Sequence, residues 1–353
     1  MNPNERTDYW RIQPHGALWG GCGSHQRKVI CRSTAYGCTG TQVGGGFSIE
    51  ALDYLEKNGC FGRVVSIAHL EDLRNEVRSL MEDGKLDGEF FKEWIAGRLD
   101  PKTPRGMAKA RSIFVTATPV PGLRVSFEWK GETIQLKVPP TYGEYTRVIT
   151  RSRRLLAEAF APKKYWTAPA VMPVKLLAVR SGLATYGRNN VTYIPKFGSF
   201  HALAALYSSF DSPEDHWQEK IVLPKCSACK ACLKACPTGA ICEDRFLIHA
   251  ERCLSRFNER DSSCPFPDWI DDSAHNALVG CMHCQRVCPY DKDVADWFVD
   301  RGRFSEEDTR YLLRGKFTGS KAVMMDRRLR RVGLDLTVFP RNLEVHLRQR
   351  SLL

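Results

Sequence analysis

Four closely spaced cysteines followed by a proline are the residues whose types and spacing could do chemistry. Residues 226–237 read CSACKACLKACP, which is the spacing C-x2-C-x2-C-x3-C-P. Two-cluster ferredoxins hold [4Fe–4S] clusters with this spacing, and the fourth cysteine serves the other cluster of the pair. Thiolates suit such a site because iron bridged by sulfide takes soft, anionic ligands. A second run, CMHCQRVCP, occupies residues 281–289, and Cys253 lies alone between the two runs.

The number of cysteines in these segments matches two clusters. Two cubane clusters need eight thiolates, and the sequence supplies eight: Cys226, Cys229, Cys232, Cys236, Cys253, Cys281, Cys284 and Cys288. A crossed arrangement predicts a first cysteine group of Cys226, Cys229, Cys232 and Cys288. The second cysteine group is then Cys236, Cys253, Cys281 and Cys284. A pair of zinc sites is the alternative, but zinc is typically held by paired C-x2-C knuckles without the triple run and the proline.

The chain has 14 cysteines, so six remain outside this count. In a reducing compartment such residues are thiols more often than disulfides. We expect no ligand role for Cys22, Cys31, Cys38, Cys60, Cys242 and Cys264. Cys242 and Cys264 are expected to be buried, and Cys60 to be structural. Eight thiolates leave no vacancy for His249, His275 or His283, which we expect at the surface or beside the clusters.

Length and composition describe an ordinary globular protein with a basic charge. The 353 residues are 43% hydrophobic and 26% charged, and the formal net charge is +12. This balance argues against a disordered or fibrous chain. No apolar run approaches the roughly 18 residues of a membrane span, and the N-terminus lacks the pattern of a secretory signal. A cytoplasmic location is therefore expected.

The pattern along the chain predicts four segments. We expect an irregular glycine-rich leader over 1–46, an α/β or α+β domain over 47–220, a two-cluster module over 221–300 and a helical basic tail over 301–353. In the second segment, strands are expected at 63–67 and 112–118, a hairpin at 124–129 and 132–138, and helices at 48–55, 70–82, 145–160, 175–180 and 200–208. Alternating strands and helices of this kind favour a mixed fold.

Several further stretches resemble one known family. Residues 178–200 read AVRSGLATYGRNNVTYIPKFGSF, which resembles the AVRAGLG-W-GKN segment of the epoxyqueuosine reductases. CPTGAI at 236–241, AERC ending at Cys253, GCMHCQRVCP at 280–289 and VFPRNLEVHL at 338–347 are similar to stretches of the same family. The cluster motifs are shared by many ferredoxins, so the SGLATYGRNN segment is the more specific feature. The resemblance extends over about residues 48–350.

The resemblance implies a fold, cofactors and an activity. Family members join a cobalamin-binding domain, akin to a reductive dehalogenase core, to a ferredoxin-like module with two [4Fe–4S] clusters. They reduce the epoxide of epoxyqueuosine in certain tRNAs to yield queuosine, which makes them oxidoreductases. An external low-potential donor, a flavodoxin or ferredoxin, is expected to load the clusters, which pass electrons to cobalt.

The resemblance also implies catalytic residues. The family supplies a proton from an aspartate in a motif resembling G-R-D-Y-H. In this chain Glu144 falls on the aspartate and Tyr145 on the tyrosine, while Gly143 replaces the arginine and Thr146 the histidine. These departures indicate a side branch of the family. The alternatives are therefore a related corrinoid and 4Fe–4S reductase acting on a small molecule, or a non-catalytic electron-transfer protein.

Cobalamin contacts are expected from the SGLATYGRNN segment. Gly182 and Gly187 would let the backbone approach a flat macrocycle closely. With Tyr186, Arg188 and Asn189, they are the residues that the resemblance places at the corrin. The alternative is a glycine-punctuated turn after a helix.

Basic residues gather in three places that would suit tRNA. They are Arg151, Arg153 and Arg154, then Lys163 and Lys164, and then Arg327, Arg328, Arg330 and Arg331. Phosphate contacts by such side chains supply much of the affinity for nucleic acid. Solvated helix faces are the alternative interpretation.

Overall fold

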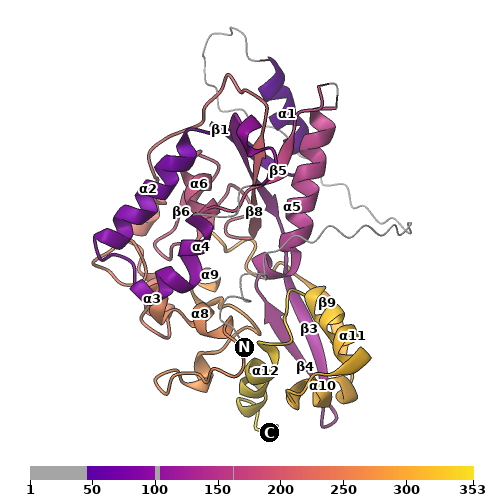
Figure 1. Cartoon of the computed structure of the whole chain (residues 1–353). Coiled ribbons are helices and arrows are strands. Elements are labelled where there is room, and N and C mark those ends of the chain that lie inside the picture. The colour runs from indigo at the N-terminus through magenta and orange to yellow at the C-terminus, as the bar shows by residue number, and fades with distance from the viewer. Residues whose placement is uncertain (1–45, 100–103, 162) are drawn as a thin grey trace.

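The computed structural model describes residues 46–99, 104–161 and 163–353, apart from the side chains of residues 46–49, 144 and 145 (Figure 1). The expected leader, with Cys22, Cys31 and Cys38, lies outside the described residues up to residue 45. In the described part, no helix is both long enough and apolar enough to cross a membrane.

A four-stranded antiparallel sheet forms the centre of the first half of the chain. Its order is β1 (Phe61–Ser66), β2 (Ser112–Pro119), β8 (His201–Ser208) and β5 (Thr167–Pro169). All three strand pairs are antiparallel. The expected mixture of helices and strands is confirmed, and the antiparallel pairing makes this half α+β.

Helices cover both faces of this sheet, because successive side chains of its central strands are buried on opposite faces. Phe114 of β2 is buried toward α1 (Gly46–Lys57) and α5 (Pro140–Ala159), whereas its neighbours Ile113 and Val115 are buried in the cluster that includes residues of α2 (His69–Glu82) and α6 (Val174–Arg180). Successive side chains of a strand point to opposite faces. Figure 1 shows the resulting layers, with α2 on one side of the sheet and α1 and α5 on the other.

Short elements complete this half. They are α3 (Gly88–Phe90), a π turn (Phe91–Ile95), α4 (Ala96–Leu99), a 3-10 turn (Met107–Lys109), β6 (Thr185–Tyr186) and β7 (Thr192–Tyr193).

A second sheet joins distant parts of the chain. Its order is β4 (Glu132–Val138), β3 (Gly122–Trp129) and β9 (Phe298–Phe304), and β9 runs parallel to β3. The helices α10 (Glu306–Leu313), α11 (Gly319–Arg330) and α12 (Phe339–Arg348) bury Leu312, Leu329 and Leu343 in one cluster with Phe127 of β3. The residues after 300 therefore share a core with β3 and β4.

The cysteine module contains only short helices between loops. They are the 3-10 turns Pro224–Ser227, Ala250–Arg252 and Asp272–Ala274, and the helices α7 (Ala231–Ala235), α8 (Leu254–Asn258) and α9 (His283–Arg286).

One expected helix is wrong. Residues 200–208 form the strand β8, which pairs with β2 on one side and β5 on the other. All eight residues of β8 are buried, so the alternation that usually reveals a strand is missing from the sequence. Alanine and leucine favour a helix only weakly, and tertiary packing overrides that preference. The expected strands β1 and β2, the β3–β4 hairpin and the helices α2 and α6 are confirmed. The helices α1 and α5 are confirmed as well, although both begin earlier than expected.

Truncation of Leu206 tests the central position of β8. Leu206 is 0% exposed and lies in one core cluster with Phe114 and Phe160. We expect Leu206→Ala to lower the free energy of unfolding by about 2–5 kcal/mol, because the change leaves a cavity. Leu353→Ala is the matched control, since Leu353 is 55% exposed. Equal urea-unfolding midpoints for the two variants would contradict the position of β8.

Candidate metal centre

The first cysteine group lines a single cavity. Cys226, Cys229, Cys232 and Cys288 all border it, together with Asn189, Tyr193, Lys225, Ala231, Pro289 and Tyr290. The 3-10 turn at Pro224–Ser227 carries Cys226, and α7 carries Cys232. Cys288 follows α9, so a segment distant in sequence completes the wall.

The thiols of the second cysteine group are half-buried, like those of the first. Burial, with smaller contributions from the nearby Cys253 and Cys236, raises the pKa of Cys281 to about 12. Burial raises the pKa of Cys284 well above its usual value, with further contributions from Cys281 and Cys253. The charges of these four thiols therefore act on one another. Cys232 of the first group also raises the pKa of Cys284, so the two groups are close to each other.

The chemistry of these thiols fits metal clusters. Burial raises the pKa of Cys232 to about 11 and that of Cys281 to about 12, so these two unliganded thiols stay protonated at neutral pH. Iron binding would release these protons, because the thiolate is the ligand. Within the residues that the structure describes, no three His, Cys, Asp or Glu side chains are placed to hold a single metal ion. The assignment of ligands to clusters stays a prediction.

Arg188 ties the SGLATYGRNN segment to the first cysteine group. Its side chain donates from Nε and Nη2 to the backbone carbonyl of Cys226, at 3.2 and 2.7 Å. Its backbone N–H lies 3.5 Å from Cys226 Sγ. Asn189 donates to the Tyr193 hydroxyl at 2.9 Å, and both side chains line the cavity. The segment thus orients the cysteine loop.

The glycines of this segment are required by the packing of the chain itself. A Cβ atom at Gly187 would lie 2.6 Å from the Tyr193 ring, and one at Gly182 would lie 3.0 Å from the Gln218 side chain. Tyr186 is buried and packs edge-on against Phe246. These contacts account for the segment without a corrin. Its expected role in cobalamin binding stays a prediction.

A buried polar network fixes the last cysteine loop. Asp291 accepts hydrogen bonds from the backbone N–H and the hydroxyl of Ser199, both at 2.7 Å. Gln285 of α9 donates to the same hydroxyl at 2.8 Å. Gly198, with φ of +52°, leaves room for this contact, because a Cβ there would lie 2.1 Å from Asp291. The loop before β8 is therefore fastened to the loop that carries Cys288.

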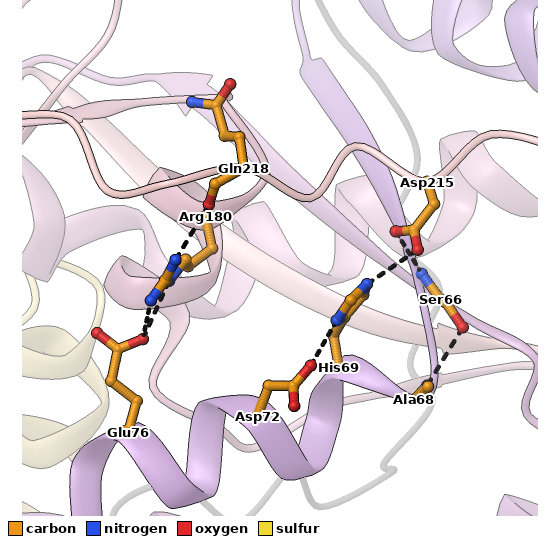
Figure 2. A network of polar contacts seen from close by, with 8 residues as sticks. All are labelled: Ser66, Ala68, His69, Asp72, Glu76, Arg180, Asp215 and Gln218. Atoms are coloured by element: carbon orange, nitrogen blue, oxygen red, sulfur yellow. Dashed lines mark hydrogen bonds and ion pairs between the residues drawn. The ribbon is translucent and has the colours of Figure 1, made fainter. Parts of the chain in front are cut away.

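The segment 211–223, which we call the strap, connects β8 to the first cysteine group. Figure 2 shows how α2 holds it. Asp215 of the strap accepts a hydrogen bond from the Ser66 backbone at 3.1 Å and contacts His69 Nε2 at 2.9 Å. His69 Nδ1 contacts Asp72 at 2.6 Å, and the His69 ring stacks on Trp217 with centroids 4.1 Å apart.

A second set of ion pairs holds the end of the strap. Arg180 of α6 donates to Glu76 of α2 at 2.8 and 3.0 Å and to the Gln218 carbonyl at 3.3 Å. Lys220 pairs with the other Glu76 oxygen. The strap then bonds to Tyr186 through the backbone of Ile221 and Leu223. Since Leu223 accepts the Cys226 N–H at 2.9 Å, this chain of contacts reaches the first cysteine group.

A group of polar side chains lies beside the second cysteine group. The Tyr142 hydroxyl donates to Glu259, and burial raises the pKa of both side chains. Lys175 donates to the Asn190 carbonyl at 3.3 Å. The side chain of Lys175 reaches the surface, but the protein around it lowers its pKa. Arg98 lowers this pKa further, whereas Cys253 and Glu259 raise it. This group was not predicted, because Tyr142, Lys175 and Glu259 share no spacing pattern in the sequence.

The expected catalytic residues lie on α5. Glu144 and Tyr145 follow Tyr142 within the first turns of this helix, and their side chains lie outside the described residues. Gly143 packs closely against β3, where a Cβ atom would lie 2.3 Å from the Leu123 side chain. The close packing of α5 against β3 therefore favours glycine at the position where the family's motif has arginine.

Of the predictions for the remaining cysteines and histidines, some are confirmed and others are wrong. Cys60 is buried, and Thr118 donates to its sulfur at 3.5 Å, which confirms a structural role. Cys242 and Cys264 are half-buried, so the expectation of buried thiols is wrong; both lie in loops, outside the helices and strands of the cysteine module. His275 is buried, and burial lowers its pKa to about 4.

The other two histidines that we expected near the clusters make local contacts. His283 contacts the Ala274 carbonyl at 2.9 Å, and His249 pairs with Glu251 at 3.0 Å.

Many residues of the expected basic clusters have partners within the chain. Arg328 pairs with Asp308 at 2.7 Å and Arg330 with Asp326 at 2.6 Å. Arg154 lies 3.8 Å from Glu158, and Arg151 donates to the Asn58 carbonyl. These contacts favour the interpretation as helix faces, in which the arginines stabilise the fold.

Comparisons with known proteins agree with this geometry. Residues 225–291 match the model of the 4Fe-4S double cluster binding domain family. The epoxyqueuosine reductase of Synechococcus sp. is 31% identical over 165 residues, which are 44% of this chain and 48% of that protein. The epoxyqueuosine reductase of Staphylococcus aureus is 27% identical over 236 residues, or 64% of this chain and 59% of that protein. The chain thus spans about half the length of these relatives.

Solved structures share the fold. The epoxyqueuosine reductase of Streptococcus thermophilus matches 85% of this chain and 80% of its own with a TM-score of 0.59 and 17% identity. An epoxyqueuosine reductase crystallised with an epoxyqueuosine-modified tRNA stem loop matches the same shares with a TM-score of 0.58 and 21% identity.

The fold and the cysteine module together define the class. The chain joins a 4Fe–4S double cluster binding domain to an α+β domain. In sequence and in fold it is similar to epoxyqueuosine reductases, which confirms the resemblance carried by the SGLATYGRNN segment.

Loss of the Glu76 carboxylate tests the contact between strap and α2. Glu76 is 15% exposed and pairs with Arg180, whereas Glu219 is 94% exposed and pairs with the same arginine at 3.1 Å. We expect Glu76→Gln to lower the free energy of unfolding by about 1–2 kcal/mol, because two cations lose a half-buried partner. Glu219→Gln is the matched control and should change it by less than about 0.5 kcal/mol. Equal effects in thermal unfolding would show that the strap is not held through Glu76.

Proposed function

We propose that this chain is an iron–sulfur reductase with two [4Fe–4S] clusters. Cys226, Cys229, Cys232 and Cys288 would hold one cluster, and Cys236, Cys253, Cys281 and Cys284 the other. The observation that carries the proposal is the common cavity of the first group, to which Cys288 contributes from a distant loop. Adjacent clusters transfer single electrons between them, which makes the module a conductor for a reductive reaction.

We propose cobalamin as the second cofactor, bound by the α+β domain. The solved epoxyqueuosine reductases share this fold. Low-valent cobalt would supply the electrons for reduction of an electrophilic substrate. Tyr142, Glu259 and Lys175 lie beside the second cysteine group, whose cluster would supply electrons to such a reaction. Their hydrogen bonds would orient polar atoms there.

The substrate that this similarity favours is epoxyqueuosine in tRNA. Conversion of an epoxide to an alkene takes up two electrons and two protons and releases water. Glu144 is the proposed proton donor to the leaving oxygen. Glu144 lies in the first turns of α5, the helix whose Tyr142 donates to Glu259. Such an enzyme would work in the cytoplasm, where tRNA is modified.

The packing of Gly143 favours a second candidate. The family's motif has arginine at this position, whereas here a Cβ atom would lie 2.3 Å from the Leu123 side chain, so any side chain requires Leu123 to move. A different first turn of α5 implies a different pocket beside Glu144. The second candidate is therefore a related corrinoid-dependent reductase that acts on a small electrophile.

Iron content tests the ligand assignment. We expect eight irons per chain in anaerobically purified protein and about four in Cys284→Ser, because one cubane loses a ligand. Cys242→Ser is the matched control and should retain eight, since Cys242 lies outside both groups. Zinc in place of iron, or an equal loss in both variants, would contradict the assignment.

The role of Glu144 is tested by Glu144→Gln. The amide has nearly the same shape but carries no transferable proton, so turnover should fall by roughly 100-fold or more. Iron and corrin content should stay unchanged. Glu158→Gln on the same helix is the control, and its turnover should equal that of the wild type. Assays with an epoxyqueuosine-modified stem loop and with small epoxides separate the two candidates, and protein that retains no corrin would contradict both.

A further inference from the structure

Two buried side chains of the α+β domain contact thiols of both cysteine groups. Asn189 and Tyr193 are each 4% exposed, and the Asn189 amide donates to the Tyr193 hydroxyl at 2.9 Å. Gly187 permits this approach, because a Cβ atom there would lie 2.6 Å from Asn189 Oδ1 and 2.6 Å from the Tyr193 ring. Both side chains border the cavity of the first cysteine group.

The Tyr193 hydroxyl reaches the first cysteine group. Burial raises the pKa of Cys288, and a hydrogen bond from the Tyr193 side chain to this thiol opposes the rise. A tyrosine hydroxyl has one hydrogen to donate. Because its oxygen already accepts a hydrogen bond from Asn189, that hydrogen is directed to the Cys288 sulfur.

The Asn189 amide reaches the second cysteine group. Its oxygen accepts the backbone N–H of Val191 at 3.3 Å, which turns the NH2 group toward Tyr193. Burial raises the pKa of Cys284, and a hydrogen bond from the Asn189 side chain opposes that rise. An amide has two N–H donors, so Asn189 can serve the Tyr193 hydroxyl and the Cys284 sulfur at the same time.

This pair of side chains differs from the local donors to the sulfurs. The backbone of Leu233 donates to Cys232, and Ser255 donates to Cys253, each from the same loop as the cysteine. Asn189 and its partner instead come from the other domain and are hydrogen-bonded to each other. One continuous chain of hydrogen bonds therefore runs from a thiol of one group to a thiol of the other.

We propose that Asn189 and Tyr193 form a hydrogen-bonded bridge between the two clusters and raise the reduction potential of each. The inference rests on the proposed function, because it requires a cluster at both groups. One added electron makes the sulfurs of a cubane more negative, so a donor stabilises the reduced form more than the oxidised form. Burial strengthens this effect, because a hydrogen bond is electrostatically stronger in a medium of low dielectric constant. Both are positioning residues, since they touch cluster ligands and no substrate.

Removal of the Tyr193 hydroxyl tests the bridge. Cluster-loaded protein is titrated anaerobically with dithionite, while electron paramagnetic resonance follows the reduction of each cluster against the solution potential. For Tyr193→Phe, we expect the ratio of oxidised to reduced cluster at the wild-type midpoint to rise about tenfold for one of the two clusters, which is ~59 mV for one electron. The other midpoint should change far less, because Asn189 still donates to Cys284.

Tyr290→Phe is the matched control. It also removes a hydroxyl from the wall of this cavity, but that hydroxyl has no hydrogen-bond partner among the residues that the structure describes. The backbone N–H of Tyr290, which donates to Cys288, is unchanged by the substitution. Both midpoints of this variant should equal those of the wild type.

Asn189→Ala tests the other end of the bridge. We expect both midpoints to fall, because Cys284 loses its donor and the Tyr193 hydroxyl loses the amide that directs its hydrogen. Iron content and the urea-unfolding midpoint show whether this variant keeps both clusters and its fold; if it does not, Tyr193→Phe decides alone. Loss of corrin with both midpoints unchanged would place Asn189 at the corrin and overturn the inference.

The iron content of the wild type separates this inference from the proposed function. Far fewer than eight irons per chain would contradict the proposed function, and the bridge with it. Eight irons with the same midpoints in the wild type, Tyr193→Phe and Asn189→Ala would contradict the bridge alone.

Discussion

The structure depends on bringing thiols from two distant loops to the same cavity. Cys226, Cys229 and Cys232 come from one short run, and Cys288 reaches the same cavity from beyond α9, where it would be the fourth ligand of a cubane. Neither loop has a regular element long enough to hold its own shape. The helices that carry these cysteines have only four or five residues. Their geometry must therefore be set by contacts with the rest of the chain.

Three contacts from the α+β domain set this geometry. Arg188 donates a hydrogen bond to the carbonyl of Cys226, and Ser199 donates one to Asp291, which lies near Cys288. The strap is held against α2 by the ion pair of Arg180 with Glu76. Each joins a loop of the cysteine module to an element of the central sheet or its helices. The domain thus builds the metal centre even though the two groups contain none of its residues. This explains why the SGLATYGRNN segment precedes the cysteines at close range.

The polar group of Tyr142, Lys175 and Glu259 lies beside the second cysteine group. It connects this group with α5, the helix that carries Glu144. Tyr142 and Glu259 come from segments 117 residues apart in the sequence, so this contact also depends on the packing of the cysteine module against α5.

Much of this could be predicted from local patterns. The spacing of Cys226, Cys229 and Cys232 predicts a cluster-binding loop, and the alternation of apolar and polar residues over 124–138 predicts the hairpin. The strand β8 could not be predicted, because all of its residues are buried and its alternation is hidden. Glu259 and Ser199 were missed for another reason: their partners lie far away in sequence, and no periodicity marks such contacts. The strap, likewise, has no signature other than its charged and aromatic residues.

The spin state of the reduced protein tests the central claim most directly, because two clusters held by crossed ligands must lie side by side. Electron paramagnetic resonance of the anaerobic protein after full reduction should show two unpaired spins per chain, with a broadened spectrum from their magnetic coupling. Two sharp, independent signals, or a single spin per chain, would contradict the account.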